Sequence, residues 1–423
     1  MVTVHEVRAC DPDSWGTLCE ELHTLATDMD EAAAGLYDRG AGRLKDNWAD
    51  DVGVKAQDEI KELAASYEIV GIQLRSARSV ISGLELTFGA CKRSIDEWLA
   101  VCERDGFSVD DEGRVTVPPD VDDPKAAQHT ADEAEAALTT ALKQAREADE
   151  TASTALKSIK LGELDADGDG DVDNEDLDKH RDETLEAGAN AALESLRGSI
   201  PSDRSAAEQR EWWDNLTPEE QEQYKRALPL ELAAMKGLPP SVRDSIDGAD
   251  LGYSRTALLE YVRDNWDNTD IDWEGKNNCT NFVSQALKHA GLDFKGVFTL
   301  QDDAWGHRLF PEMPLIGDKG GYTDSWGGAD AQHDLFAESG SESVGIEGAQ
   351  PGDVIYWTHD NGEDAAGEEH HAAVVTSVLP NGDILYTQHT DSATNQSLQG
   401  RLPHNNVAEG DQEIQIVRVK ETW

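Results

Sequence analysis

A cysteine stands where a helix is expected to begin. Residues 277–287, Asn-Asn-Cys-Thr-Asn-Phe-Val-Ser-Gln-Ala-Leu, start with asparagine caps and continue with apolar residues on one helical face, and Gly291 follows the expected end. Cys279 then falls in the first turn. There the helix dipole and the unpaired backbone N–H groups favour the thiolate, which is the nucleophilic form. A cysteine in a helix is also a common packing residue, so its chemistry depends on its partners.

Two histidines, His371 and His389, lie on a predicted β-hairpin downstream of this helix. Apolar and β-branched residues favour strands, and a Pro-Asn-Gly sequence separates the two strands of the hairpin. An acidic loop precedes the first of them. The predicted strands are residues 351–357, 370–376 and 384–390.

The turn of this hairpin decides which side chains share a face of the sheet. Pro-Asn-Gly at 380–382 favours a type I turn with a G1 bulge. This turn places His371 opposite Asp391 and diagonally across from His389, with the two histidine α-carbons roughly 7–8 Å apart. A plain two-residue turn shifts the register by one, and Gln388 then takes the place of His389.

Four short motifs occur in order along this part of the chain. They are Cys-Thr-Asn-Phe-Val-Ser-Gln at 279–285, Gly-Asp-Val-Ile-Tyr at 352–356, His-Ala-Ala-Val-Val at 371–375 and Gln-His-Thr at 388–390. Between Tyr253 and about Leu398 the sequence therefore resembles the putative amidase domain family of the papain-like cysteine peptidase superfamily, whose relatives include bacterial cell-wall endopeptidases. The family often has Asp before the cysteine, where this sequence has Asn278.

The resemblance implies a catalytic role for each of the singled-out residues. Cys279 is the nucleophile, His371 the base and His389 the third polar member, with Gln388 and Asp391 as alternatives for the third position. His371 takes the thiol proton and returns it to the leaving amine, while the third residue orients the imidazole. The backbone N–H of Cys279 helps to bind the oxyanion. The implied reaction is hydrolysis of an amide bond in peptidoglycan peptides, with no cofactor for catalysis.

Two other interpretations of these residues stay open. The cysteine and the two histidines have the donor types of a zinc site, or the histidines are ordinary strand residues. Three aromatic residues between the helix and the strands either floor a sugar or peptide groove or belong to the core: Trp305, Tyr322 and Trp326.

An acidic loop with a regular pattern lies near the middle of the chain. It has oxygen ligands at positions 1, 3 and 5, Gly at 6, a hydrophobic residue at 8 and an acid at 12, which suits a cation with six or seven oxygen ligands. The loop resembles the EF-hand calcium loop and, with Asp at position 12, the dockerin-type loops. The alternative is a disordered acidic linker. The candidate structural calcium ligands are Asp165, Asp167, Asp169, Asp171, Asp173 and Asp176.

The N-terminal region is expected to be an antiparallel helical hairpin. Apolar residues at steps of three and four run from Asp11 to about Glu103, with a break near residues 48–53. In such a hairpin, the sequence numbers of two residues that face each other add up to a nearly constant value. This predicts two disulfides and an oxidising environment, against the alternative of four buried thiols. The predicted pairs are Cys10–Cys102 and Cys19–Cys91.

The hairpin with Trp48 at its bend resembles the WXG-like modules that actinobacteria export by type VII secretion. The bend has Trp48-Ala49-Asp50, so the usual Gly is missing. The resemblance implies a secretion partner and a secreted or cell-wall location without a cleavable signal peptide, and the alternative is a cytoplasmic protein. It also suggests two other functions: an exported effector or toxin that carries an amidase domain, or a non-catalytic, calcium-dependent wall-binding protein.

Length and charge limit the organisation and the partners. A chain of 423 residues exceeds one hydrophobic core, and a formal charge of -50 disfavours nucleic acid and anionic membranes. No apolar run is long enough for membrane insertion. We expect a multidomain protein with an all-α N-terminal half and a C-terminal α+β papain-like domain. The expected segments are the hairpin (1–105), a β-hairpin and helix–calcium loop–helix (106–200), a connector (201–250) and the amidase domain (251–423).

Overall fold

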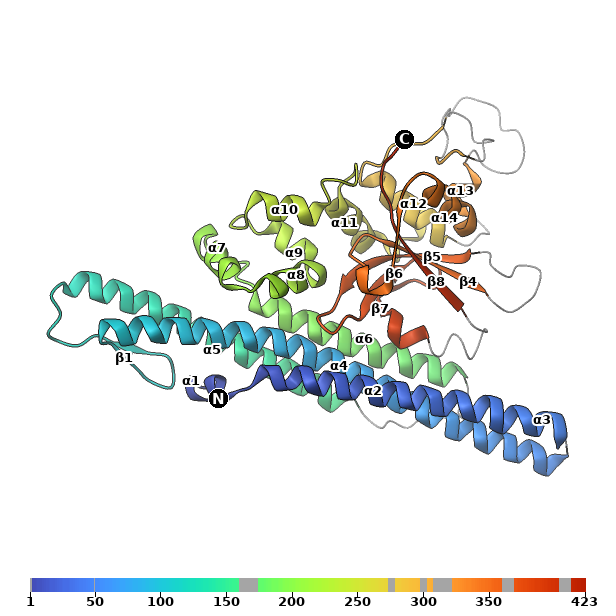
Figure 1. The fold of residues 1–423 in the computed structure, drawn as a ribbon, viewed down its shortest axis with the longest axis horizontal. Helices are drawn as coiled ribbons and strands as arrows, with labels where there is room; N and C mark the ends of the chain where they lie inside the picture. Colours follow the sequence, from blue (N-terminus) through green and yellow to red (C-terminus); the bar gives the residue numbers. More distant parts are fainter. Residues whose placement is uncertain are drawn as a thin grey trace. The chain divides into compact units, whose positions relative to one another are not determined.

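A computed structural model gives the fold of both parts of the chain. The N-terminal half is helical, and the C-terminal part combines helices with an antiparallel sheet (Figure 1). These two findings confirm the predicted all-α half and the α+β class of the remainder. The structure describes residues 2–48, 50–159, 174–272, 278–296, 303–306, 322–359, 369–402 and 412–423.

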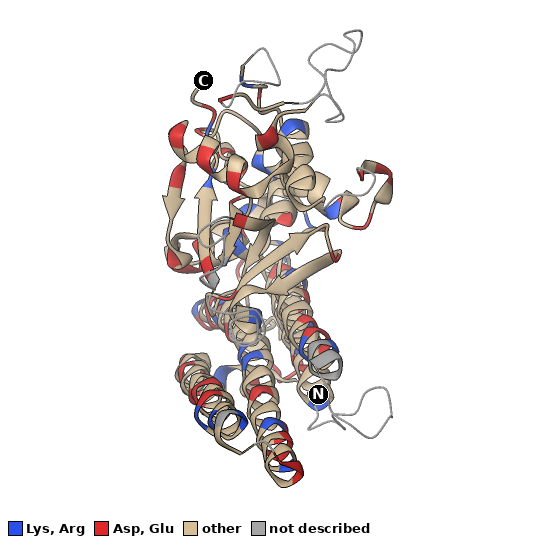
Figure 2. Cartoon of the chain, turned by 90° about the vertical axis from the view of Figure 1, so that its right-hand side faces the viewer, with Lys and Arg blue, Asp and Glu red and all other residues tan. Residues whose placement is uncertain are grey.

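Acidic side chains are distributed over the helices and loops of both parts (Figure 2). They are not gathered in one segment, which fits the excess of 86 Asp and Glu over 36 Lys and Arg along the whole sequence. Within the described residues, no helix has the length and hydropathy needed to cross a membrane.

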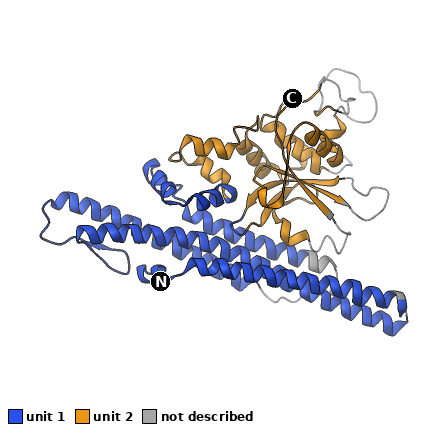
Figure 3. Cartoon of the chain, viewed as in Figure 1, with its two compact units in different colours: residues 1–227, 379–381 blue, residues 228–378, 382–423 orange. Residues whose placement is uncertain are grey.

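The chain forms two compact units, shown in different colours in Figure 3. One comprises residues 1–227 with 379–381, and the other comprises residues 228–378 with 382–423. We call them the helical unit and the α+β unit. The predicted connector, residues 201–250, is divided between them.

The helical unit is built around its longest helix, α4, which packs against α2, α5 and α6. A capping box begins its last helix, where Thr217 and Glu220 exchange hydrogen bonds of 2.8 and 3.2 Å between side chain and backbone. The elements are α1 (Val4–Ala9), α2 (Pro12–Gly35), the π-helix η1 (Leu36–Gly42), α3 (Arg43–Asn47), α4 (Asp51–Asp105), β1 (Ser108–Val109), β2 (Val115–Thr116), α5 (Pro124–Ser158), α6 (Asn174–Ser199), α7 (Ala206–Asn215) and α8 (Pro218–Ala227).

Helix α4 begins and ends with defined caps. The carboxylate of Asp50 accepts hydrogen bonds from the backbone N–H groups at the start, and Gly106 ends the helix in the left-handed conformation with φ of 76°. Helix α6 approaches α4 so closely that a Cβ on Gly83 would lie 2.8 Å from the Cα of Ala192. A larger residue than glycine at position 83 would therefore separate the two helices.

Helix α5 has one buried face, although its sequence contains few large apolar residues. Alanines and leucines at helical spacing form one buried stripe that packs on α4. Because alanine has a small side chain, the helix axes can approach closely without large apolar residues. The buried residues are Ala131, Ala134, Leu138, Ala141, Leu142, Ala145, Ala148 and Ala152.

The register of the helical hairpin contradicts the predicted disulfides. The thiol of Cys19 lies 3.6 Å from the carbonyl oxygen of Arg78, and Lys92 donates a 2.6 Å hydrogen bond to the carbonyl of Cys10. Each partner lies roughly 15–20 Å along α4 from the predicted one. Because the bend lies at residues 48–50, equal lengths of helix on its two sides bring Cys19 to Arg78. The thiols are free, and the predicted pairs are wrong: Cys10–Cys102 and Cys19–Cys91.

The predicted calcium loop falls largely outside the described residues. Asp176 lies in the first turns of α6. The remaining candidate ligands are not described by the structure: Asp165, Asp167, Asp169, Asp171 and Asp173.

The α+β unit contains a six-stranded antiparallel sheet in the order β3-β8-β4-β5-β6-β7. Its helices are α9 (Pro229–Ala234), α10 (Pro240–Asp247), α11 (Arg255–Asn265), η2 (Thr269–Ile271), α12 (Cys279–His289), α13 (Asp324–Gly327), α14 (Ala329–Glu338) and η3 (Ile346–Gly348). Its strands are β3 (Glu342–Val344), β4 (Val354–His359), β5 (Glu369–Val378), β6 (Ile384–Gln388), β7 (Ala393–Ser397) and β8 (Gln412–Arg418).

Alternation along the central strands gives this sheet two apolar faces. Val354 and Tyr356 of β4 face α11, α12 and α14 and belong to one buried cluster. Ile355 and Trp357 belong to a second cluster with residues of β5, β6 and β8. Both faces of β4 are therefore buried, which explains its continuous apolar sequence. Two of the three aromatic candidates are core residues, because Trp305 and Trp326 are 0% and 1% exposed, whereas Tyr322 is half-buried.

A buried ion pair joins the start of β4 to the end of β8. Asp353 accepts two hydrogen bonds from the Arg418 guanidinium, of 3.0 and 2.9 Å, and a third from the backbone N–H of Gln350. The Asp353 side chain is 1% exposed. Its burial raises its pKa, against the lowering effect of Arg418. The bidentate geometry compensates for the cost of removing both charges from water.

We predict that Asp353→Ala destabilises the α+β unit by about 3–5 kcal/mol, because it leaves Arg418 with an uncompensated charge. Urea unfolding followed by tryptophan fluorescence measures this change. The matched control is Glu342→Ala, which removes the exposed 3.1 Å pair with Lys420 and should cost less than about 1 kcal/mol. Equal losses in the two variants would contradict the assignment.

Candidate active site

Cys279 is the first residue of α12, and its side chain is buried with 4% exposure. Asn278 occupies the capping position, but its side chain makes no capping hydrogen bond to the backbone N–H groups of the first turn. Instead its Oδ1 accepts from the Asn281 side chain, and its backbone N–H donates to Thr390 Oγ1 at 3.0 Å. The helix start is thus tied to the residue after Gln388 and His389, which brings two distant motifs together.

Buried hydrogen bonds fix the orientation of α12. The indole N–H of Trp326 donates to Asn281 Oδ1 at 3.0 Å, and that of Trp305 donates to Ser284 Oγ at 3.1 Å. Gln332 of α14 also donates to the Ser284 hydroxyl at 2.7 Å. The polar residues of the cysteine motif therefore satisfy buried indoles and hold the helix in one position against its neighbours.

His371 lies on β5 directly opposite Trp357 of β4. The two rings pack with centroids 5.1 Å apart. The imidazole of His371 lies near enough to the Cys279 thiol to affect the pKa of that thiol. The structure therefore brings together the predicted cysteine and the first predicted histidine. Trp357 is a neighbour of the site that the sequence motifs do not identify, because its place opposite His371 depends on the register between β4 and β5.

The second ring nitrogen of His371 contacts Gln388. His371 Nε2 and Gln388 Oε1 lie 2.9 Å apart, and Gln388 Nε2 donates to the backbone carbonyl of Asp391 at 3.0 Å. That second bond fixes the orientation of the amide, so its oxygen faces the ring. Because a carbonyl oxygen only accepts, His371 carries a proton on Nε2. The neutral ring then has its lone pair at Nδ1, which suits acceptance of a thiol proton.

A β-bulge explains why Gln388 occupies this place. Near the turn, Val378 pairs with Ile384, and Gly382 has φ of 84°, as the predicted G1-bulge turn requires. A register shift at Thr376 then moves the pairing by one residue, so that Val374 pairs with Thr387. Continuing this register puts Gln388 on the face of His371. The predicted turn is present, but the bulge shifts the pairing by one residue. Gln388, and not His389, therefore shares a face of the sheet with His371.

His389 therefore does not contact His371, in contrast to the first prediction. Its Nδ1 lies 2.8 Å from the Trp266 carbonyl oxygen, its Nε2 lies 2.5 Å from Asp272 Oδ1, and its ring stacks on Phe282 at 5.2 Å. Both nitrogens are occupied, so His389 neither orients the base nor completes a Cys-His-His metal site. Among the described residues, no group of three His, Cys, Asp or Glu is arranged to hold a metal.

Asp391, the other alternative, contributes its backbone and not its carboxylate. Asp391 is exposed and has a φ of 51°, and its backbone carbonyl accepts a hydrogen bond from the Gln388 amide. The left-handed conformation turns this carbonyl toward Gln388. An aspartate tolerates that conformation better than most residues other than glycine.

The environment of Cys279 favours its ionised form. Burial of the thiol raises its pKa, but the hydrogen bond and the charge of His371, together with a hydrogen bond from the Ala372 backbone, outweigh this effect. The pKa of Cys279 is lowered to about 7. At Cys19 and Cys91, burial outweighs the lowering effect of a nearby arginine, and the pKa values are raised to about 11 and about 12.

A buried thiol at a helix N-terminus, paired with an imidazole on an antiparallel sheet, defines the chemical class of this site. The comparison with protein families gives the same region: residues 252–415 match the family described as a putative amidase domain. The matched range contains Cys279, His371 and Gln388. No curated protein and no solved structure matches the chain.

We predict that Cys279 ionises near neutral pH, at least two pH units below the other thiols. Thiolate forms as pH rises through the pKa, so the ultraviolet thiolate absorbance of the folded protein should gain a step centred near pH 7. Cys279→Ala should remove this step, and His371→Ala should move it to higher pH. Cys19→Ala is the control and should leave it unchanged. A step that survives in Cys279→Ala would contradict the assignment.

Proposed function

We propose that the α+β unit is a thiol-dependent amidase. The observation that carries the proposal is the chain of contacts from the buried Cys279 thiol to His371 and from His371 to Gln388. Cys279 is the nucleophile and His371 the general base, while Gln388 is a positioning residue that sets the tautomer of the base. This chain is the papain-like form of the triad, with an amide in the third position.

The proposed reaction has two stages. The Cys279 sulfur attacks the carbonyl carbon of the substrate amide as its proton passes to His371 Nδ1. The tetrahedral intermediate collapses, His371 returns the proton to the leaving amine, and a thioester forms. Water, deprotonated by His371, then attacks the thioester, and the carboxylic acid leaves as the thiol is regenerated. No redox step or metal is required by this balance.

The oxyanion of each intermediate needs hydrogen-bond donors. The first backbone N–H groups of a helix have no intrahelical acceptor, and the helix dipole adds positive potential at this end. The N–H of Cys279 lies at the start of α12 and supports this role. The same potential that stabilises the thiolate therefore also stabilises the charge that develops on the substrate.

The substrate that we propose is an amide bond in peptidoglycan stem or cross-bridge peptides. The support for this choice is the similarity of the four motifs to relatives of cell-wall endopeptidases. A secreted or wall-associated location agrees with such a substrate, and the WXG-like hairpin supplies a route of export in the same proposal.

Purified peptidoglycan tests the reaction and the substrate together. We predict that wild type releases new amines, that Cys279→Ala releases none, and that His371→Ala is slower by roughly a thousandfold. Cys102→Ala, a buried thiol in the helical unit, is the control and should match wild type. Equal release by wild type and Cys279→Ala would overturn the proposed catalysis, and no release by wild type would overturn the proposed substrate.

A second pair of variants separates Gln388 from His389. Gln388→Ala should lower kcat by roughly 10–100-fold with little change in KM or Tm, because the ring loses its orienting acceptor. His389→Ala should lower Tm, because it removes the links to Trp266 and Asp272. Steady-state kinetics and thermal unfolding of both variants check this. The reverse assignment of the two effects would restore His389 as the third member.

A further inference from the structure

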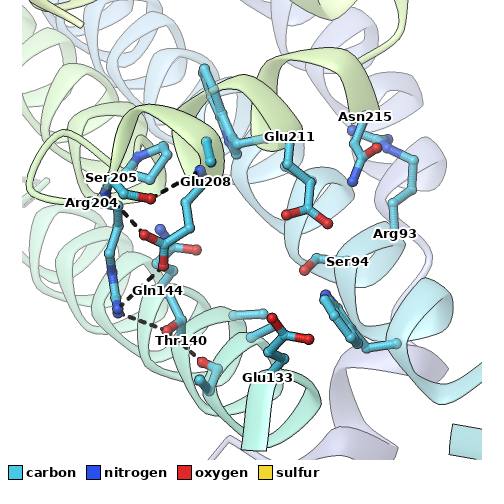
Figure 4. A pocket seen from close by; sticks show the side chains of 18 of the residues that line it. Arg93, Ser94, Glu133, Thr140, Gln144, Arg204, Ser205, Glu208, Glu211 and Asn215 are labelled. Atoms are coloured by element: carbon cyan, nitrogen blue, oxygen red, sulfur yellow. Dashed lines mark hydrogen bonds and ion pairs between the residues drawn. The ribbon is translucent and has the colours of Figure 1, made fainter. Parts of the chain in front are cut away.

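The helical unit contains a cavity of about 590 Å³ that the proposed amidase reaction does not use. It lies between α4, α5 and α7, with the turn at 201–205 along one side (Figure 4). Small residues of α4 and α5 leave this space open, because alanines occupy positions where larger residues would fill it. These alanines are Ala90, Ala136, Ala137 and Ala141.

Two indoles form part of the cavity wall, Trp98 of α4 and Trp212 of α7. Trp212 is held in place by an edge-on contact with Tyr224 at 5.1 Å and a tilted contact with Trp213 at 6.1 Å. A wall of fixed aromatic rings favours apolar groups and, through the ring quadrupole, cations.

Carboxylates complete the lining, and ion pairs account for only some of them. Arg204 lies 3.9 Å from Glu208, and the carboxylate of Glu208 also caps the start of α7 through Ser205. Arg93, the other lining cation, pairs with Glu220 outside the cavity at 2.5 Å. Both arginines of the lining are therefore already committed to other acids.

Two glutamates of the lining have no Lys or Arg ion-pair partner among the residues that the structure describes. Figure 4 shows Glu133 of α5 and Glu211 of α7 pointing toward one another across the cavity, with the Ser94 hydroxyl between them. The only ion-pair partner of Glu133 in the described structure is His129 at 3.3 Å, which is charged only when protonated. Both glutamates are exposed to solvent. The pKa of Glu211 is raised by partial burial and by repulsion from Glu97, Glu133 and Glu208. A cation between these carboxylates would relieve the repulsion.

We propose that this cavity binds an organic ammonium ion with an apolar body. The ammonium group lies between Glu133 and Glu211, and the apolar body packs on the alanine floor and the two indoles. An inorganic cation would not use the apolar surface, and a neutral apolar molecule would gain nothing from the two carboxylates. The combined lining thus selects for charge and hydrophobicity in the same ligand.

The test uses the full chain and isothermal titration calorimetry with two matched probes, hexylammonium chloride and hexanol. We expect saturable binding of hexylammonium at one site per chain, weaker at high salt, and at least roughly tenfold weaker binding of hexanol. A lysine-containing tripeptide is a third probe, since its side chain carries the same ammonium chemistry. Tighter binding of the tripeptide than of hexylammonium would assign the site to peptides, and the reverse would assign it to free amines.

Charge-neutralising variants locate the site. Glu211→Gln and Glu133→Gln should each weaken hexylammonium binding by roughly five- to tenfold, because each removes one charged partner. Glu103→Gln, an exposed acid of α4 outside the cavity, should bind like wild type. Circular dichroism confirms that each variant is folded. No saturable hexylammonium binding, equal binding of hexanol, or unchanged affinity in both cavity variants would overturn the proposal.

Discussion

The hydrogen bond between His371 Nε2 and Gln388 Oε1 is the constraint on which the site depends. It places the ring proton on one nitrogen and leaves the other with the lone pair that the proposed role of His371 as general base needs. The bond forms only because the Gln388 amide is itself held by the Asp391 carbonyl and because the bulge at Thr376 turns Gln388 to the correct face. A backbone irregularity thus sets the protonation state of a side chain.

The same region resolves a conflict between burial and charge. Removing Cys279 from water opposes its ionisation, yet the proposed reaction requires the thiolate. The paired imidazole and the Ala372 backbone outweigh the desolvation, and the helix start adds further positive potential. These effects require that α12 is held in one position. Its polar side chains fix that position because they accept hydrogen bonds from the buried indoles of Trp305 and Trp326.

In the helical unit, small residues determine how closely the helices pack, and acidic residues line the space that the packing leaves. Helix α4 packs on three neighbours, and glycines and alanines allow close approach where large residues are scarce. Where the alanines of two helices do not meet, a cavity remains, and Glu133 and Glu211 face it. Most of the excess acidic residues are thus distributed over the helices and loops, but in one place the fold brings carboxylates together beside an apolar surface.

Local patterns by themselves determined the helices, the strands and the G1-bulge turn, because periodicity, caps and turn residues act within a few positions of the chain. The pairing of Cys279 with His371 was implied by the resemblance of the ordered motifs to a known family, and not by local patterns. Only the tertiary structure decided the choice of Gln388 over His389 and the register that separates Cys19 from Cys91. A one-residue bulge reverses the faces of a strand, and a few residues at a helical bend shift every contact beyond it. Such offsets accumulate along an element, so its ends are correctly paired only when the whole element is packed in three dimensions.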